Sequence, residues 1–273
     1  MSAASASERR LNSLYTGLCG IMRDYAGYIR GGQLQVSTPL LEAAGVGRRF
    51  GALAVLDGVN FTLAGGESVG IVGPNGAGKT TLLNILAGSL RPSSGTVHFR
   101  AVDITGLRAD RRCRLGIARA HQIPRPFGGM TVFENVLVGI SRHGPARYER
   151  GTEVLELCGL IHLANRQAAS LGLLDRKRLE LARALATDPA VLLLDEIGGG
   201  LTDAEATELL HTIKEVRRQD VAIVWIEHIV HVLLQAIDRL VCLDVGRIIA
   251  DGAPETVIND AAVVDAYLGG NRV

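Results

Sequence analysis

One stretch of the sequence, residues 73–81, combines closely spaced glycines with a lysine and two threonines. It matches the pattern G-x-x-x-x-G-K-[ST] in full. Its members are Gly73, Pro74, Asn75, Gly76, Ala77, Gly78, Lys79, Thr80 and Thr81. Glycines let successive backbone N–H groups wrap a phosphate, and a following helix adds positive potential. Lys79, one of only three lysines in the chain, would meet the outer phosphates, and Thr80 would bind Mg²⁺. The stretch therefore predicts a site for the phosphates of a nucleotide.

Two acidic residues follow a short apolar run at residues 191–194. Such a run is typical of a parallel strand that is buried on both faces. Asp195, at its end, would orient Mg²⁺ through water. Glu196 is then free to act as the general base toward an attacking water. Taken alone, the pair could be two solvated acids at a strand end, but the complete phosphate loop favours the catalytic interpretation.

His228 ends a second buried run, at residues 221–226. A single histidine at a strand end is more often structural than catalytic, and His231 nearby raises the alternative of a metal pair. No cysteine or third histidine stands close in sequence, which argues against a metal. We therefore expect neutral His228 to contact the terminal phosphate and the attacking water.

Several elements must position these side chains. Apolar and polar residues alternate over 59–63 and again at 97–99, which predicts half-buried strands. Residues 68–72 read as the strand that leads into the phosphate loop, and residues 82–90 as the helix behind it. We expect the early sheet to have antiparallel strands beside the loop-bearing strand.

The second half of the chain alternates helices and strands. Helices are expected over 132–140, 154–163 and 176–186, and Thr202 with Glu205 forms a capping-box signature for another. Because buried strands alternate with helices, the core should be a parallel α/β sheet.

Composition limits the function classes. The chain has 273 residues, 47% of them hydrophobic, with a net charge of +1. A disordered chain is excluded, and a nucleic-acid binder that relies on a general positive field is disfavoured. Apolar runs reach only about six residues, whereas a membrane-spanning helix needs about 20. The cysteines show no metal spacing and suggest reduced thiols in a cytosolic protein: Cys19, Cys113, Cys158 and Cys242.

Residues 1–39 differ in composition from residues 40–273, because they begin with a stretch rich in serine and alanine. We expect residues 40–273 to form the folded domain. An apolar stripe over 11–29 fits one helical face, although three glycines weaken the helix. The extension is either loosely ordered, an amphipathic helix that docks on a partner or membrane surface, or the product of a wrong start site.

These motifs together resemble the ATP-binding subunits of ABC transporters over about residues 41–270. The phosphate loop, Gln122, the Leu-Leu-Leu-Asp-Glu strand end and His228 carry the resemblance. It implies that Phe50 stacks on adenine, and that Gln122 ligates Mg²⁺ and senses the permease. It also implies that residues 199–202 cross to a second subunit.

Residues 128–136, 165–168 and 266–269 are most similar to ATPases of branched-chain amino-acid importers. The implied fold is a P-loop NTPase (RecA-like) parallel-sheet core with an antiparallel β subdomain and an inserted α-helical subdomain at about 123–186. The implied activity is ATP hydrolysis with Mg²⁺ that powers an importer from the cytoplasmic face of the membrane. The implied partners are permease subunits, a second ATP-binding subunit and, indirectly, a substrate-binding protein, with no nucleic acid.

The sequence departs from the family at its signature, usually Leu-Ser-Gly-Gly-Gln. Residues 171–175 read Leu-Gly-Leu-Leu-Asp, so Gly172 stands at the nucleotide contact in place of serine. Ile197 replaces the usual proline, and Thr202 replaces an aspartate. Because the half that completes a partner's site is degraded, we expect a heterodimer.

Other functions remain as alternatives. ABC ATPases for urea or for lipid export remain possible, because the permease and the binding protein select the cargo. Non-transport ABC ATPases of DNA repair insert long coiled coils, but only 92 residues (171 − 79) separate Lys79 from Leu171. A GTPase would need an Asn-Lys-x-Asp motif, which is absent from the sequence. A cluster of four arginines is either a solvated helix face or a contact for permease or anionic lipid: Arg108, Arg111, Arg112 and Arg114.

Overall fold

The computed structural model describes residues 38–141 and 143–269. The expected N-terminal extension lies outside the described residues, apart from its last two positions. No described helix is both long enough and apolar enough to span a lipid bilayer.

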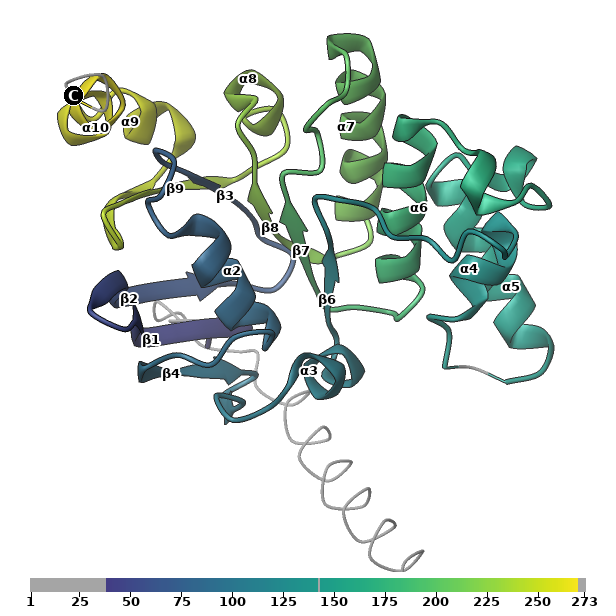
Figure 1. The fold of residues 1–273 in the computed structure, drawn as a ribbon, viewed down its shortest axis with the longest axis horizontal. Helices are drawn as coiled ribbons and strands as arrows, with labels where there is room; N and C mark the ends of the chain where they lie inside the picture. The colour runs from purple at the N-terminus through teal and green to yellow at the C-terminus, as the bar shows by residue number, and fades with distance from the viewer. Residues whose placement is uncertain (1–37, 142, 270–273) are drawn as a thin grey trace, which may run out of the picture. The chain divides into compact units, whose positions relative to one another are not determined.

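The central sheet has six strands in the order β10-β9-β3-β8-β7-β6 (Figure 1). The strands from β9 to β6 are mutually parallel, and β10 is an antiparallel edge strand. Their bounds are β3 (Ser68–Val72), β6 (Ile117–Ala120), β7 (Val191–Asp195), β8 (Ala222–Ile226), β9 (Arg239–Asp244) and β10 (Arg247–Gly252). Every residue of β3, β7 and β8 is buried, as the continuous apolar runs predicted.

A separate antiparallel sheet has the order β2-β1-β4-β5. Its strands are β1 (Leu41–Phe50), β2 (Leu53–Leu63), β4 (Ser94–Phe99) and β5 (Val102–Asp103). The alternation over 59–63 is confirmed, because Val59, Phe61 and Leu63 are buried and the residues between them are exposed. The expectation that these strands flank the loop-bearing strand is wrong, since β3 pairs with β8 and β9 instead.

Helix α2 (Lys79–Ala87) packs in the core between the two sheets. Its apolar residues Leu82, Leu83, Ile85 and Leu86 are fully buried in one cluster with side chains from both sheets. The helix was predicted over 82–90, but it begins earlier, at Lys79 within the glycine-rich loop. It ends at Ala87, where Gly88 caps it in a left-handed conformation with φ +77°.

The remaining helices are α3 (Ala109–Leu115), α4 (Val132–Leu137), α5 (Pro145–Leu157), α6 (Leu173–Leu185), α7 (Asp203–Arg217), α8 (Val230–Leu233), α9 (Pro254–Ile258) and α10 (Ala261–Gly269). Figure 1 shows α4, α5 and α6 grouped at one side of the central sheet, next to the edge strand β6.

Three helix predictions need new bounds. Helix α4 ends before the expected residue 140. The helix expected over 154–163 begins earlier, at Pro145, and ends at Leu157, shortly before Gly159 turns the chain with φ +68°. Helix α6 begins three residues earlier than expected, so the signature segment forms its first turn. The capping box of Thr202 and Glu205 is confirmed at the start of α7.

Candidate active site

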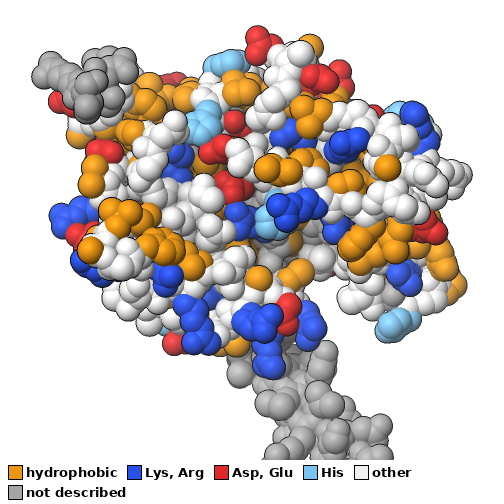
Figure 2. All heavy atoms as spheres, in the orientation of Figure 1, with side chains coloured by type: hydrophobic (Ala, Val, Ile, Leu, Met, Phe, Trp, Pro, Cys, Tyr) orange, Lys and Arg blue, Asp and Glu red, His pale blue; other side chains and the backbone are white. Residues whose placement is uncertain are grey.

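The chemistry-bearing segments converge at one edge of the central sheet. Strands β3, β8 and β7 are parallel neighbours, so their carboxyl ends meet at the same edge. The phosphate loop follows β3, Asp195 ends β7, and His228 follows β8. Figure 2 shows acidic, basic and histidine side chains gathered near the middle of this face, over the ends of the central strands.

The glycines of the phosphate loop are required by close backbone packing. Gly73 has φ +144°, and a Cβ there would lie 1.9 Å from the carbonyl oxygen of Leu243. Gly78 has φ +104°, and a Cβ there would meet the carbonyl oxygen of Val55 at 2.8 Å. A side chain at either position would push the loop away from the sheet, which explains the pattern beyond phosphate contact.

Lys79 lies inside the loop with 6% of its surface exposed. Its ammonium group donates to the carbonyl oxygens of Gly73 at 2.7 Å and Pro74 at 2.9 Å. Burial lowers the pKa of Lys79, and the nearby charges of Glu196, Cys242 and Asp195 oppose that shift. The cation is therefore held where the outer phosphates would replace the two carbonyls.

Asp195 is buried and is paired with a residue that the sequence analysis missed. Arg119, on β6, donates to Oδ2 of Asp195 at 2.5 Å and to Oδ1 of Asn84, on α2, at 2.5 Å. The other oxygen of Asp195, Oδ1, is buried without a hydrogen-bond partner. A buried carboxylate oxygen without a partner is costly unless a cation or its water completes it.

The donors available here fit Mg²⁺. The free oxygen of Asp195 and the hydroxyl of the exposed Thr80 are hard oxygen ligands, and Mg²⁺ is usually held by one or two such groups plus substrate phosphates and water. Among the described residues no three His, Cys, Asp or Glu side chains cluster as a metal site. The site therefore suits a cation that arrives with a nucleotide.

Glu196 is held between the other two predicted catalytic residues. Its Oε1 lies 2.7 Å from Nε2 of His228, and its Oε2 accepts from Nε2 of Gln122 at 2.6 Å. The backbone N–H of Glu196 donates to the carbonyl of Ile226, on β8, at 2.8 Å. The structure thus brings together Glu196, His228 and Gln122, which lie far apart in sequence. Gln122 contacts Glu196 here, so its role as a magnesium ligand stays a prediction.

A second missed residue, Glu227, ties two loops of the site together. It is 3% exposed, and its Oε2 accepts from the backbone N–H of Gly198 at 2.9 Å. Its Oε1 accepts from the backbone N–H groups of His228 at 2.9 Å and Ile229 at 3.4 Å. One buried carboxylate therefore connects the loop after Glu196 to the loop that carries His228. The sequence feature that could have identified Glu227 is the presence of an acidic residue directly after a fully apolar strand.

Lys177, on α6, extends this polar network. It is 4% exposed, and its ammonium group donates to the backbone carbonyl of Gln122 at 3.3 Å. Burial lowers the pKa of Lys177, while the charge of Glu227 opposes that shift. The helix that begins at the signature is thereby connected to the segment that carries Gln122.

Phe50 ends β1 with 47% of its surface exposed. The guanidinium of Arg48 lies 4.5 Å from the ring centroid. An exposed ring is available to stack on a base, and Phe50 is not among the buried core residues. Its contact with adenine stays a prediction.

The degenerate signature lies at the start of α6. Gly172 is the N-cap, with an extended backbone and no side-chain cap. Leu173 follows with 44% of its surface exposed, and its Cδ2 would lie 3.4 Å from a Cβ on Gly200. Asp175 pairs with Arg178 at 3.7 Å. The surface offered at this position is therefore apolar, where a serine hydroxyl would be a donor.

The predicted arginine cluster divides into exposed and buried members. Arg108, Arg111 and Arg114 are exposed, but Arg112 is fully buried, so a uniformly solvated helix face is wrong. Arg112 donates to the carbonyls of Ile85 and Leu86 at the end of α2, at 2.8 and 2.9 Å. Burial lowers its pKa to about 10. It is a structural cap for the helix that follows the phosphate loop.

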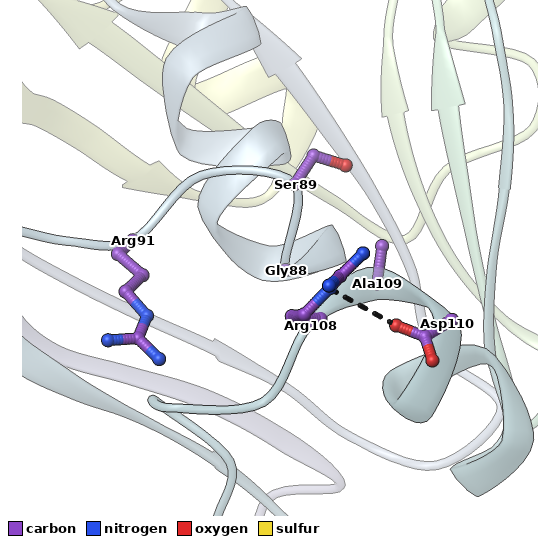
Figure 3. Close-up of a pocket in the computed structure, with 6 residues that line it drawn as sticks. All are labelled: Gly88, Ser89, Arg91, Arg108, Ala109 and Asp110. Atoms are coloured by element: carbon purple, nitrogen blue, oxygen red, sulfur yellow. Dashed lines mark ion pairs between the residues drawn. The ribbon is translucent and has the colours of Figure 1, made fainter.

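A shallow hollow lies beside this cap (Figure 3), and none of the catalytic groups lines it. Its lining residues are Gly88, Ser89, Arg91, Arg108, Ala109 and Asp110. The close-up shows Arg108 directed toward Asp110, with which it forms an ion pair at 3.6 Å. Both side chains are mostly exposed, so the pair contributes little energy.

Comparison with protein families gives two matches. A model described as "ABC transporter" matches residues 56–198. A second, described as "Branched-chain amino acid ATP-binding cassette transporter", matches residues 247–272.

The curated proteins to which the chain is similar over 253 residues include the following two. One is the high-affinity branched-chain amino acid transport ATP-binding protein LivG of Escherichia coli K12, at 37% identity with 86% of this chain and 99% of LivG covered. The other is BraF of Pseudomonas aeruginosa, at 36% identity with the same coverage.

Solved structures give the same fold. The ADP conformation of MJ1267, an ATP-binding cassette of an ABC transporter, aligns with a TM-score of 0.79 at 31% identity, over 85% of this chain and 100% of that one. A nucleotide-free cassette from an ABC transporter aligns with a TM-score of 0.77 at 31% identity, over 84% and 99%. The predicted P-loop NTPase fold, with parallel and antiparallel sheets and helices, is confirmed.

Proposed function

This chain belongs to the ABC transporter family as an ATP-binding subunit, and we propose that it hydrolyses ATP to power the import of branched-chain amino acids. The observation that carries the proposal is the position of Glu196 between His228 and Gln122, at the edge of the sheet that also bears a complete phosphate loop. The names of the similar proteins and the match over residues 247–272 support the cargo.

Each residue of the site has a part in the reaction. Lys79 leaves the carbonyls of Gly73 and Pro74 to meet the outer phosphates, and the loop amides surround them. Thr80 and the unpaired oxygen of Asp195 would hold Mg²⁺, which would supply neutralisation of phosphate charge. Arg119 binds the other oxygen, Oδ2, and so fixes the orientation in which Oδ1 of Asp195 stays unpaired.

Glu196 takes the proton of the attacking water. In the structure both of its carboxylate oxygens are engaged, by His228 and by Gln122. Each of these oxygens keeps a second lone pair that can accept the proton of the water. Movement of Gln122, which the buried Lys177 connects to the signature helix, would couple the base to the arrangement of the helices.

The test is Glu196→Gln in the assembled transporter. The variant keeps the side-chain shape but loses the base, so hydrolysis should fall about 10²- to 10⁴-fold while ATP stays bound. Lys79→Ala should lose ATP binding itself. Glu255→Gln, on the exposed side of α9, is the matched control and should leave turnover unchanged. Near wild-type hydrolysis by Glu196→Gln would remove Glu196 from the role of base.

The subunit would act at the cytoplasmic face of a membrane, bound to permease subunits and to a second ATP-binding subunit. A heterodimer is favoured because Gly172 has no hydroxyl to offer a phosphate held by the partner, whereas the residues that hold this chain's own nucleotide are complete. A substrate-binding protein would supply the cargo on the other side of the membrane.

A further inference from the structure

The C-terminal helix α10 brings a tyrosine against the phosphate loop. Val263 anchors the helix in the main core with 5% of its surface exposed. Tyr267 is four residues further along the helix, on the same face. Its hydroxyl oxygen accepts a hydrogen bond from the backbone N–H of Gly73 at 2.8 Å, across 194 residues of sequence. Figure 1 shows α10 close to the end of the sheet where β3 leads into the loop.

Both backbone polar groups of Gly73, the N–H and the carbonyl, are therefore hydrogen-bonded to side chains. Its N–H donates to Tyr267, and its carbonyl accepts from Lys79 at 2.7 Å. Its Cα is pressed against β9, where a Cβ would lie 1.9 Å from the carbonyl of Leu243. The Lys79 contact can be exchanged for a contact with phosphate when the ammonium turns to the nucleotide. The tyrosine contact involves the peptide group before Gly73, not the one after it, and can persist.

The surroundings of Tyr267 keep its hydroxyl neutral. Burial raises the pKa of Tyr267, the bond from Gly73 opposes the shift, and Cys242 adds to it. The phenol is therefore protonated throughout the physiological range, and its oxygen accepts from Gly73 through a lone pair. The ring itself is 47% exposed, so the described core does not account for the position of this residue.

We propose that Tyr267 is a positioning residue for ATP: its hydroxyl fixes the first peptide of the phosphate loop in the shape that receives phosphate, so that the C-terminal helix sets the nucleotide affinity of this subunit. The inference rests on the proposed function only in taking ATP as the ligand, and it is independent of the transported cargo.

The experiment is Tyr267→Phe in the full-length subunit, which removes one oxygen and keeps the ring. The dissociation constant for Mg·ATP should rise about 2- to 12-fold, the range expected for one net hydrogen bond. In the assembled transporter KM for ATP should rise by the same factor, while kcat at saturating ATP stays within about twofold, since no reacting group has moved. Tyr148→Phe, an exposed tyrosine of α5, is the matched control and should change neither quantity.

A double-mutant cycle separates positioning from general stability. Val263→Ala loosens the helix that carries Tyr267, so it should weaken ATP binding in the wild-type background and have less effect in the Tyr267→Phe background. An unchanged dissociation constant for Tyr267→Phe, or a lower melting temperature with unchanged affinity, would overturn the proposal. If the wild-type subunit failed to bind Mg·ATP at all, the proposed function would fail instead.

Discussion

Glu196 adopts a left-handed backbone conformation, with φ +47°, that glutamate rarely takes. Such a position costs about 1–3 kcal/mol and persists only where the surroundings fix it. Here the backbone N–H is bound to β8 and both carboxylate oxygens are bound to side chains. The conformation turns Glu196 out of the strand that ends at Asp195. The two adjacent carboxylates therefore contact different partners, Arg119 for Asp195 and the His228–Gln122 pair for Glu196.

A prediction for a single residue of the site concerns Phe50. Phe50→Ala should weaken ATP binding several-fold, because stacking of an aromatic ring contributes about 0.5–1.5 kcal/mol. Stability should change little, since the ring is 47% exposed. Equilibrium binding of ATP and thermal unfolding are the measurements. Leu53→Ala is the control, because Leu53 is the cross-strand neighbour of Phe50 and is 65% exposed. Equal ATP affinity for the two variants would remove Phe50 from the site.

At the scale of elements, the loops after β7 and β8 are joined through Glu227. Glu227→Gln replaces one acceptor oxygen by an amide that cannot accept from Gly198 or His228. Hydrogen bonds to a charged group contribute about 1.5–3 kcal/mol, so the two loops should loosen. We expect kcat to fall about tenfold or more at nearly constant KM for ATP.

Steady-state kinetics of the assembled transporter over a range of ATP concentrations would measure this split. Glu227→Asp, which keeps the charge on a shorter side chain, should recover part of the rate. A loss of thermal stability with unchanged kcat would mean that Glu227 only supports the fold.

The segment before α4 presents an apolar surface of Ile123, Phe127 and Met130, each at least 39% exposed. The backbone of Phe127 is fixed on both sides by the fully buried Asn135, at 2.8 and 3.1 Å. The guanidinium of Arg183 lies 4.9 Å from the ring centroid. A rigidly presented aromatic ring in the segment that follows Gln122 suits contact with the permease.

Phe127→Asp should therefore lower both co-purification with the permease and ATP-driven transport, because it places a charge in an apolar interface. The matched control is Val138→Asp, since Val138 is also exposed, at 53%, and lies after α4. If both variants retained the permease equally well, the surface around Phe127 would not be the docking site.

At the scale of the whole molecule, the structure combines a complete nucleotide-holding half with an incomplete signature. Glu196, His228 and Gln122 are assembled, whereas Gly172 and Leu173 open the signature helix without a hydroxyl. A hydrogen bond to a charged phosphate contributes about 1.5–3 kcal/mol, which the partner's site would lack. Turnover should therefore depend mainly on this chain's own Glu196.

The prediction is checked by a Glu→Gln change of the catalytic base in one ATPase at a time. The change in this chain should abolish most transport-coupled hydrolysis, and the change in the partner should cost much less. Gly172→Ser should raise the contribution of the partner's site. Equal losses from the two changes, or full activity from a homodimer of this chain, would contradict the asymmetry.

Three features could be predicted from the sequence alone: the phosphate loop, the strand ends that carry Asp195 and His228, and the capping box at α7. These are local patterns, since a loop's conformation and a strand's burial follow from residues within a few positions of one another. The boundaries of α2 and α6 were less well predicted because their first turns lie inside motifs that read as loops.

Contacts between side chains that are far apart in the sequence could not be predicted, because they depend on how the elements pack. Strand order places Arg119 of β6 beside Asp195, and the docking of α10 places Tyr267 on Gly73. The same holds for Arg112, which looked solvated in sequence and caps α2 in the core. Each contact joins residues that are 27 to 194 positions apart. Such pairs leave no periodic signal, because they depend on which elements pack together, and that choice is made by burial of the whole apolar surface at once.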